Sequence, residues 1–115
     1  MRGNFATTTR IAAVQHGRVA SWQLSGADID RHTIQRWLAD GRLHRVHHGV
    51  YAVGHVAPSV HADYMAAVLC CGAGTILTHR AAAYLRLALR GACPPPAEVT
   101  VPTIAGRRRP GIVIH

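Results

Sequence analysis

The stretch 30–53, DRHTIQRWLADGRLHRVHHGVYAV, contains a helix pattern that is followed directly by a strand pattern. In its first half the apolar residues recur at i, i+3 and i+4, the spacing that gives a helix one apolar stripe. They are Ile34, Trp37 and Leu38. Asp30 can cap the helix N-terminus, and Gly41 is a typical residue just after a helix C-terminus. The first half therefore predicts an amphipathic helix that ends before Gly41.

Two short β-prone runs come next, at residues 43–46 and 50–53. The tripeptide His47-His48-Gly49 between them can reverse the chain, so the two runs are expected to pair as a hairpin. A helix with a basic, amide-bearing outer face, followed at once by a basic hairpin, is typical of the winged helix-turn-helix. In that fold the helix fits the major groove of DNA, and the hairpin, called the wing, lies beside it.

Shorter elements before residue 30 fit the same motif. Expected in order are a loose arm at residues 1–6, a helix at 9–16, a strand at 18–20, a second helix at 22–25 and a turn at 26–29. One of the threonines 7–9 would cap the first helix, and the strand would pair with the wing. Trp22 and Leu24 are expected to face the core. The sequence thus predicts a winged helix-turn-helix DNA-binding domain at about residues 8–55.

Residues 60–115 are predicted to form two helices plus a β-hairpin, as a partial second domain. Ser59 and Thr78 would cap the two helices, the second of which runs to about residue 89. Apolar residues at helical spacing on the first of them are Val60, Tyr64, Ala67, Val68 and Cys71. Strands at 98–101 and 112–114 would form the hairpin. The edge of the last strand has no evident cover, so the chain is expected to be a fragment or a shortened form of a longer relative.

Length and hydrophobic content are those of a globular protein, and the mix of predicted helices and strands is that of the α+β class. It has 115 residues, of which 49% are hydrophobic, enough for one domain or for one small domain and part of another. No apolar run approaches the roughly 18 residues that span a bilayer, and the N-terminus has no apolar signal core. A cytoplasmic protein without a membrane partner is therefore expected.

The chain is strongly basic, with a formal net charge of +8, and all 13 of its basic residues are Arg. Residues 1–57 contain seven Arg and three Asp, which gives +4, and residues 58–115 contain six Arg, one Asp and one Glu, again +4. Arg presents a planar fork of donors that suits phosphates and guanine edges. The charge suggests nucleic acid as a partner, although a GC-rich coding sequence also produces an Arg-only composition.

Two sets of polar residues are candidates for DNA contacts. The candidates for reading base edges lie on the outer face of the predicted 31–39 helix and are Arg31, His32, Gln35 and Arg36. The candidates for phosphate or minor-groove contacts lie on and beside the wing and are Arg42, Arg45, His47 and His48. The alternatives are a solvated helix face for the first set and a polar turn for the second. The position opposite an apolar stripe and directly before a wing favours DNA contact.

Metal and thiol chemistry find little support in the sequence. Cys70, Cys71 and Cys93 have neither a disulfide framework nor a CxxC spacing, so reduced and mostly packed thiols are expected. The chain has nine histidines, and three of them are close together in the hairpin, but a turn would scatter those three. Since no pair of ligands has zinc spacing, no metal and no cofactor is expected.

The sequence also argues against an enzyme. Only five residues are acidic, Glu98 stands alone in the sequence, and neither a nucleophile elbow nor a Walker loop is present. The tripeptide Thr78-His79-Arg80, with Tyr84, could resemble a catalytic group, but a capped helix start explains it equally well. The basic run Arg107-Arg108-Arg109 is either a second phosphate contact or a solvated turn.

Several segments together resemble a known family. The stretch Ile11–Gly54, with DGRLHRVHHGVYAVG, is followed by HADYMAAVL, LTHRAAAYLRL and EVTVP. This series, over roughly residues 10–115, resembles the N-terminal region of AbiEi-type abortive-infection antitoxins. It is equally similar to actinobacterial proteins that carry the same winged-helix module ahead of a restriction-endonuclease-like domain.

The resemblance implies a winged-helix DNA-binding module. In the antitoxins this module represses the promoter of its own operon. A separate C-terminal domain counters a nucleotidyltransferase-like toxin without stable binding, in the type IV arrangement. The chain ends before a full antitoxin C-terminal domain or an endonuclease domain. From the resemblance we therefore expect the chain to bind DNA rather than to neutralise a toxin.

Taken together, the sequence predicts a transcriptional regulator that binds double-stranded DNA, in a toxin–antitoxin or related operon. A homodimer is expected if the operator is an inverted repeat. Two alternatives remain open. The chain could be the DNA-targeting module of a truncated restriction-endonuclease-like protein, or an interaction protein that holds a toxin or another partner through residues 60–115.

Overall fold

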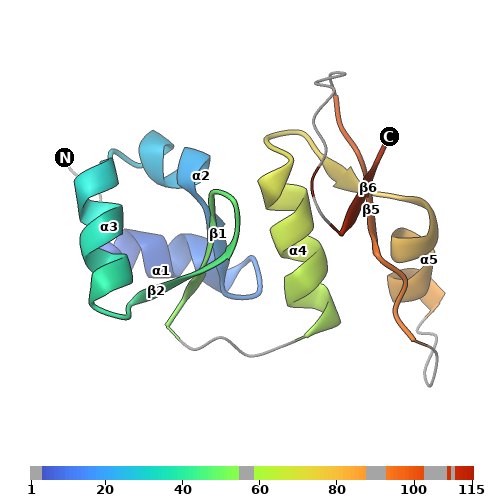
Figure 1. Cartoon of the computed structure of the whole chain (residues 1–115), viewed down its shortest axis with the longest axis horizontal. Coiled ribbons are helices and arrows are strands. Elements are labelled where there is room, and N and C mark those ends of the chain that lie inside the picture. Colours follow the sequence, from blue (N-terminus) through green and yellow to red (C-terminus); the bar gives the residue numbers. More distant parts are fainter. Residues whose placement is uncertain (1–3, 55–58, 88–92, 103–108, 110) are drawn as a thin grey trace.

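Two small sheets lie on either side of one helix, α4 (Figure 1). The structure is a computed structural model that describes residues 4–54, 59–87, 93–102, 109 and 111–115. Its elements are, in order, α1 (Phe5–Ala13), β1 (Arg18–Ala20), α2 (Ser21–Gly26), α3 (Arg31–Ala39), β2 (Leu43–His47), β3 (Val50–Val53), α4 (Val60–Cys70), β4 (Ile76–Leu77), α5 (His79–Leu87), β5 (Ala97–Thr100) and β6 (Ile112–Ile114). The protein is therefore of the mixed α+β class that the sequence predicted.

The first sheet is antiparallel and has the strand order β1-β3-β2. Strands β2 and β3 form the predicted hairpin, and Gly49 in their connection has a φ of 72°, a value that favours glycine. Tyr51 in the central strand faces Val19 of β1 on one side and Arg45 of β2 on the other. The predicted pairing of the 18–20 strand with the hairpin is thus confirmed.

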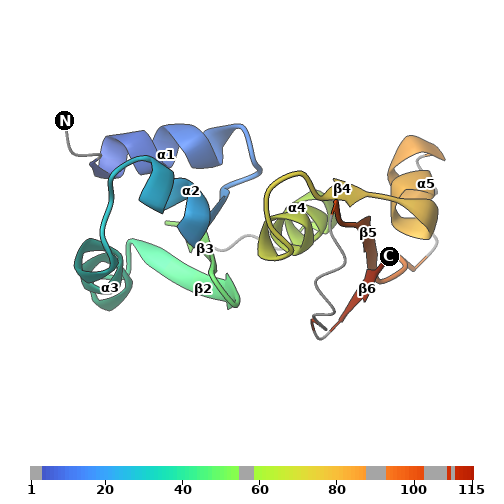
Figure 2. The ribbon, with the colours of Figure 1, turned by 90° about the horizontal axis from the view of Figure 1, so that it is seen from above.

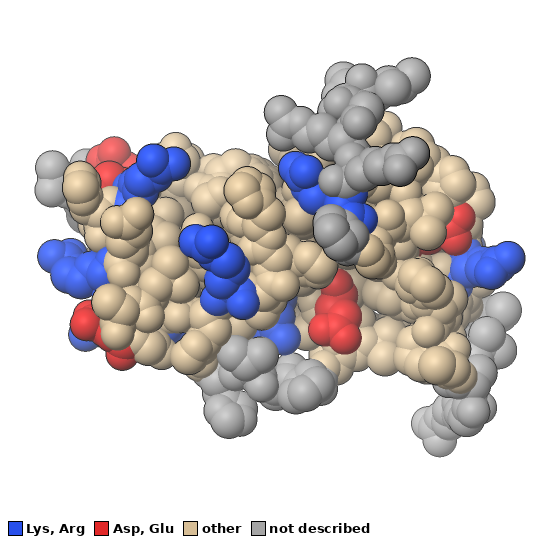
Figure 3. Space-filling view, in the orientation of Figure 1, with Lys and Arg blue, Asp and Glu red and all other residues tan. Residues whose placement is uncertain are grey.

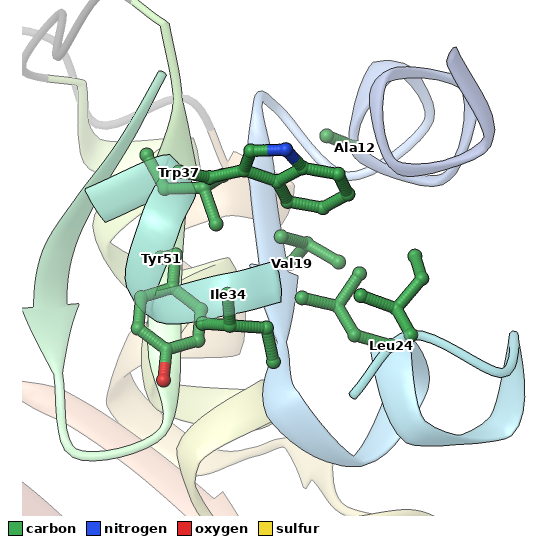
Figure 4. Packing of buried hydrophobic residues seen from close by; sticks show 8 residues of the cluster. Ala12, Val19, Leu24, Ile34, Trp37 and Tyr51 are labelled. Atoms are coloured by element: carbon green, nitrogen blue, oxygen red, sulfur yellow. The ribbon is translucent and has the colours of Figure 1, made fainter. Parts of the chain in front are cut away.

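Helices α1, α2 and α3 cover one face of this sheet, and α3 runs crosswise to α1 (Figure 2). Their shared core consists of Ala12, Val19, Leu24, Ile29, Ile34, Trp37, Leu43 and Tyr51 (Figure 4). The predicted apolar stripe of α3 is confirmed, because Ile34 and Trp37 are buried and Leu38 packs against the same core. The ring of Trp37 also contacts Phe5 of α1 edge-on, with centroids 5.2 Å apart.

Helix α4 covers the other face of the same sheet. Its Ala66 and Leu69 pack against Ala20 of β1 and Val50 of β3. Its Tyr64 and Ala67 belong instead to a cluster with α5 and the second sheet. A helix that is apolar on most of its circumference is expected to be buried on several sides, and α4 is placed in that way.

The sequence correctly predicted how α4 begins, and part of what it buries. The hydroxyl of Ser59 accepts a hydrogen bond from the Ala62 amide at 2.9 Å, which is the predicted cap. Within the predicted stripe, Tyr64 and Ala67 are buried, whereas Val60, Val68 and Cys71 are only half-buried. A single apolar stripe predicts one buried face, whereas this helix is buried on two.

The second sheet has the strand order β4-β5-β6 and corrects one prediction. Strands β5 and β6 pair in parallel, with Glu98 opposite Val113, so these two strands do not form the predicted hairpin. A pattern of alternating apolar residues predicts which face of a strand is buried, but it does not give the direction of the strand. The antiparallel neighbour of β5 is β4, a short strand that pairs through Ile76 and Leu77.

Two details of the N-terminal half also differ from expectation. Helix α1 begins at Phe5 rather than near Thr9, because the Asn4 side chain accepts the Thr7 amide at 3.0 Å and so provides the cap. Trp22 was expected in the core, but it is 43% exposed. Its indole Nε1 donates to the Leu69 carbonyl at 3.0 Å and thereby fastens α2 to α4.

Some predictions fall outside the described residues. The last part of the predicted 78–89 helix, Arg107 and Arg108 of the basic run and most of the N-terminal arm are among them. The boundary between the two predicted domains stays a prediction. Within the described residues no helix is long and apolar enough to cross a membrane.

The close contact of α4 with the first sheet leads to a stability prediction. Ala66 is 2% exposed between α4 and that sheet, so Ala66→Leu should overfill the interface and lower the free energy of unfolding by about 1–3 kcal/mol. Urea denaturation followed by circular dichroism measures this value. Ala83→Leu on the exposed side of α5 is the matched control, expected within about 0.5 kcal/mol of the parent protein. Equal stability of the two variants would contradict the placement of α4.

Candidate nucleic-acid interface

A hydrogen-bonded turn joins the end of α2 to the start of α3. The Ile29 amide donates to the Leu24 carbonyl at 3.0 Å, and the Asp28 amide donates to the Ser25 carbonyl at 3.1 Å. This is the Schellman arrangement that ends a helix, with Asp28 in the left-handed position at a φ of 63°. The Asp30 carboxylate then accepts the Thr33 amide at 2.8 Å and caps α3, as predicted.

The exit from α3 is fixed in the same manner. Gly41 has a φ of 80°, its amide donates to the Leu38 carbonyl at 3.3 Å, and the Arg42 amide donates to the Trp37 carbonyl at 2.9 Å. Strand β2 begins one residue later at Leu43, which is 1% exposed in the core. With no free linker between them, α3 and the hairpin have one relative orientation.

The four candidates for reading base edges lie together on the outside of α3. They are Arg31, His32, Gln35 and Arg36, and all are exposed. At about 100° per residue they span an arc of about 140° on the helix, opposite the side that carries Ile34 and Trp37. The structure therefore brings the predicted set onto one solvent-facing surface.

The candidates on the hairpin are divided between its two faces. A bulge in the pairing of β2 with β3 lies between Arg45 and His47. Arg45 faces Tyr51, a residue of the core beneath α1, α2 and α3, whereas His47 faces Val50, which packs against α4. Since side chains of cross-strand partners share a face, Arg45 lies on the α3 side of the sheet and His47 on the α4 side. Regular alternation would have placed both on one face.

The surroundings of the hairpin candidates differ accordingly. Arg45 is exposed, and the Arg42 guanidinium lies 5.4 Å from the centre of the ring of Phe5, the first residue of α1, which is a cation–π contact. His48 is exposed in the turn, where its carbonyl accepts the Cys70 thiol at 3.6 Å. His47 is half-buried and lines a cavity of about 250 Å³ with α4 and residues 94–97.

Charge is dispersed over this end of the molecule. Residues 30–53 contain four Arg and two Asp, which gives a net charge of +2. Figure 3 shows Arg side chains over α3 and the hairpin that are set apart by neutral atoms, with acidic side chains nearby. Such a surface can contact phosphates at separate points, while a continuous basic patch is not seen on this face.

The redox state of the cysteines agrees with the expectation of reduced thiols, but their burial agrees only in part. All three are free thiols, and Cys70 and Cys71 are half-buried, but Cys93 is exposed rather than packed. Burial, with a further contribution from the neighbouring Cys70, raises the pKa of the Cys71 thiol. A raised pKa disfavours the thiolate that would act as nucleophile or metal ligand.

A second group of polar side chains was not predicted from the sequence. His79 at the start of α5, Glu98 on β5 and His115 after β6 lie together, with His115 Nε2 2.6 Å from Glu98 Oε2. The hydrogen bond from His115 lowers the pKa of the Glu98 carboxyl, and the backbone amide of Arg80 adds to this effect. Glu98 is thus isolated in the sequence but not in space. Residues 17 and 19 apart have no recognisable ligand spacing, so only the strand pairing reveals the group.

Comparison with known proteins gives no family for the chain: no protein-family model matches it, and no curated protein matches it significantly. The likeness to AbiEi-type antitoxins therefore rests on sequence motifs alone.

The cap at the start of α3 leads to a prediction about the stability of the protein. Asp30→Ala removes the acceptor for the Thr33 amide and should lower the free energy of unfolding by about 1 kcal/mol. Thermal and urea denaturation measure this loss. Asp40→Ala is the matched control at the other end of α3, where a negative charge opposes the helix dipole, so its removal should be neutral or slightly stabilising. A larger loss for Asp40→Ala than for Asp30→Ala would be inconsistent with the cap.

Proposed function

We propose that the chain is a sequence-specific DNA-binding regulator, in which α3 reads the major groove and the β2–β3 hairpin contacts the phosphate backbone as a wing. The observation that carries the proposal is the single exposed face of α3 with Arg31, His32, Gln35 and Arg36. Cap motifs at both ends hold that face in one orientation to the hairpin.

The arrangement of elements supports a winged helix-turn-helix. The order helix, strand, helix, helix and hairpin, with β1 beside the hairpin, is the order expected for that motif from the sequence. Helix α4 packs on the sheet face opposite α3, so it leaves the outer surface of α3 uncovered.

The side chains supply the chemistry of base and backbone contacts. Arg31 and Arg36 can each pair bidentately with the O6 and N7 atoms of guanine, and Gln35 can pair with adenine. On the same side of the sheet, Arg45 is the best placed of the hairpin residues for a phosphate. His47 packs toward α4, so in this proposal it stabilises the hairpin and does not contact DNA.

From the resemblance to AbiEi-type antitoxins we propose that the protein binds and represses the promoter of its own operon. Bound protein would exclude RNA polymerase from the promoter by steric overlap, and no catalysis is required. A nucleotidyltransferase-like toxin encoded in the same operon would be its functional partner, in the cytoplasm. An inverted-repeat operator would call for two copies of the chain related by a two-fold axis.

A second candidate function is partner binding through residues 60–115. Ile76 and Val113 are 59% and 45% exposed, and the strand register places both on one face of the second sheet. Co-purification with the product of a neighbouring gene, together with failure to prefer any DNA sequence, would favour this candidate over DNA binding.

Direct titration of DNA tests the base-reading face. The duplex from upstream of the coding region should bind a hundredfold or more tightly than a scrambled duplex, a difference of about 2.7 kcal/mol. Arg31→Ala, Gln35→Ala and Arg36→Ala should each remove about 1–3 kcal/mol of this preference. Arg86→Ala, an exposed position on α5, is the matched control and should retain it. Equal affinity for both duplexes would reject the proposal.

A salt series tests the wing separately. Arg45→Ala should weaken binding to the native and the scrambled duplex alike, because a phosphate contact does not depend on sequence. The slope of log affinity against log salt concentration should decrease by about 1. His47→Ala is the comparison on the other face of the hairpin and should leave the slope unchanged. A change of slope for His47→Ala but not for Arg45→Ala would place the DNA on the α4 side of the hairpin and contradict the proposed role of Arg45.

A further inference from the structure

Three potential metal ligands converge at the end of the molecule away from α3. His79, Glu98 and His115 each offer one ligand atom, and these atoms all lie within 4.8 Å of one another. The Glu98 Oε2 atom is 2.6 Å from His115 Nε2 and 3.8 Å from His79 Nδ1. The two imidazole rings are neighbours, with centroids 4.2 Å apart and planes inclined by 30°.

These separations are close to those around a small transition-metal ion. In tetrahedral zinc sites the bonds to nitrogen and oxygen are about 2.0–2.2 Å long, so neighbouring ligand atoms are about 3.3 Å apart. The distances from Glu98 Oε2 to the two histidines, 2.6 and 3.8 Å, lie on either side of that value, so an ion would bind with a small rotation of the exposed imidazoles. Two neutral imidazoles and one carboxylate are a donor set that suits Zn²⁺ and neighbouring first-row ions.

Surrounding groups hold the ligands in place. The Arg80 backbone amide donates to Glu98 Oε1 at 3.3 Å and leaves Oε2 directed toward the histidines. The Thr78 hydroxyl lies 2.9 Å from His79 Nδ1 and itself accepts from the Thr100 hydroxyl at 3.1 Å. The bond from the Arg80 amide is an outer hydrogen bond of the kind that orients the ligands of protein metal sites, and the Thr78 contact acts in the same way when His79 binds the ion through its other ring nitrogen, Nε2.

We propose that His79, Glu98 and His115 bind one divalent transition-metal ion, with zinc the best fit, and leave its fourth position to water or a further ligand. The open position follows from exposure, because the side chains of His79 and His115 are 53% and 42% exposed while Glu98 is 14% exposed. The ion would join the start of α5 to β5 and to the residue after β6. This site is separate from the DNA-binding surface, and neither proposal depends on the other.

Titration of the metal-free chain with Zn²⁺, and with Co²⁺ as a spectroscopic substitute, tests the site. Calorimetry should find one ion per chain, the Co²⁺ complex should show the absorption of a four-coordinate ion, and the melting temperature should rise with metal concentration. Glu98→Gln and His115→Ala should each weaken binding at least tenfold. Circular dichroism of the metal-free variants checks that each is folded.

His44→Ala is the matched control, because His44 is also an exposed histidine but lies on β2. It should bind the ion as the parent protein does. Absence of a one-to-one complex with either metal would overturn the proposal. So would equal affinity of the parent protein, Glu98→Gln and His115→Ala, which would indicate binding at histidines elsewhere in the chain.

Discussion

The packing of α4 between two sheets is the constraint on which the rest of the structure depends. The first sheet has only three short strands, and its central strand β3 is buried on both faces. One face is covered by α1, α2 and α3, and the other by α4 through Ala66 and Leu69. Without α4, residues such as Ala20 and Val50 would be open to water, at a cost of about 25 cal/mol for each Å² of apolar surface. The hairpin is therefore supported from behind by α4.

This support separates the residues that stabilise the N-terminal half from those proposed to contact DNA. The apolar stripe of α3 is used by the core, so the outer face of the helix is free to carry Arg, Gln and His, and on the same side of the sheet the exposed Arg45 lies on the edge strand β2. The cap at Asp30 and the exit at Gly41 set the position of α3 along its axis and its rotation about it. A helix held in this way loses little further backbone freedom when its side chains contact a base, which is why a fixed scaffold favours specific recognition.

Local patterns in the sequence predicted the elements, while contacts between distant residues were not predictable. The helical spacing of Ile34 and Trp37 and the caps at Asp30 and Ser59 act over a few residues, and the structure confirms them. The bulge that moves His47 to the α4 side depends on pairing between strands, and the parallel direction of β6 depends on the path of the connecting chain. The cluster around Glu98 likewise forms only when β5, β6 and α5 are assembled. The predicted α3 surface could be found because its residues are neighbours in one helix.

The most direct test of the account is to map the proposed DNA-binding surface residue by residue. Nuclear magnetic resonance spectra of the ¹⁵N-labelled chain, recorded during titration with the duplex from upstream of its coding region, report which backbone amides change their environment. We expect the largest shifts in α3 and along β2, with α5 and β6 unchanged because they lie at the other end of the molecule (Figure 1). Shifts confined to α5 and the second sheet, with α3 unaffected, would contradict the account and transfer recognition to residues 60–115.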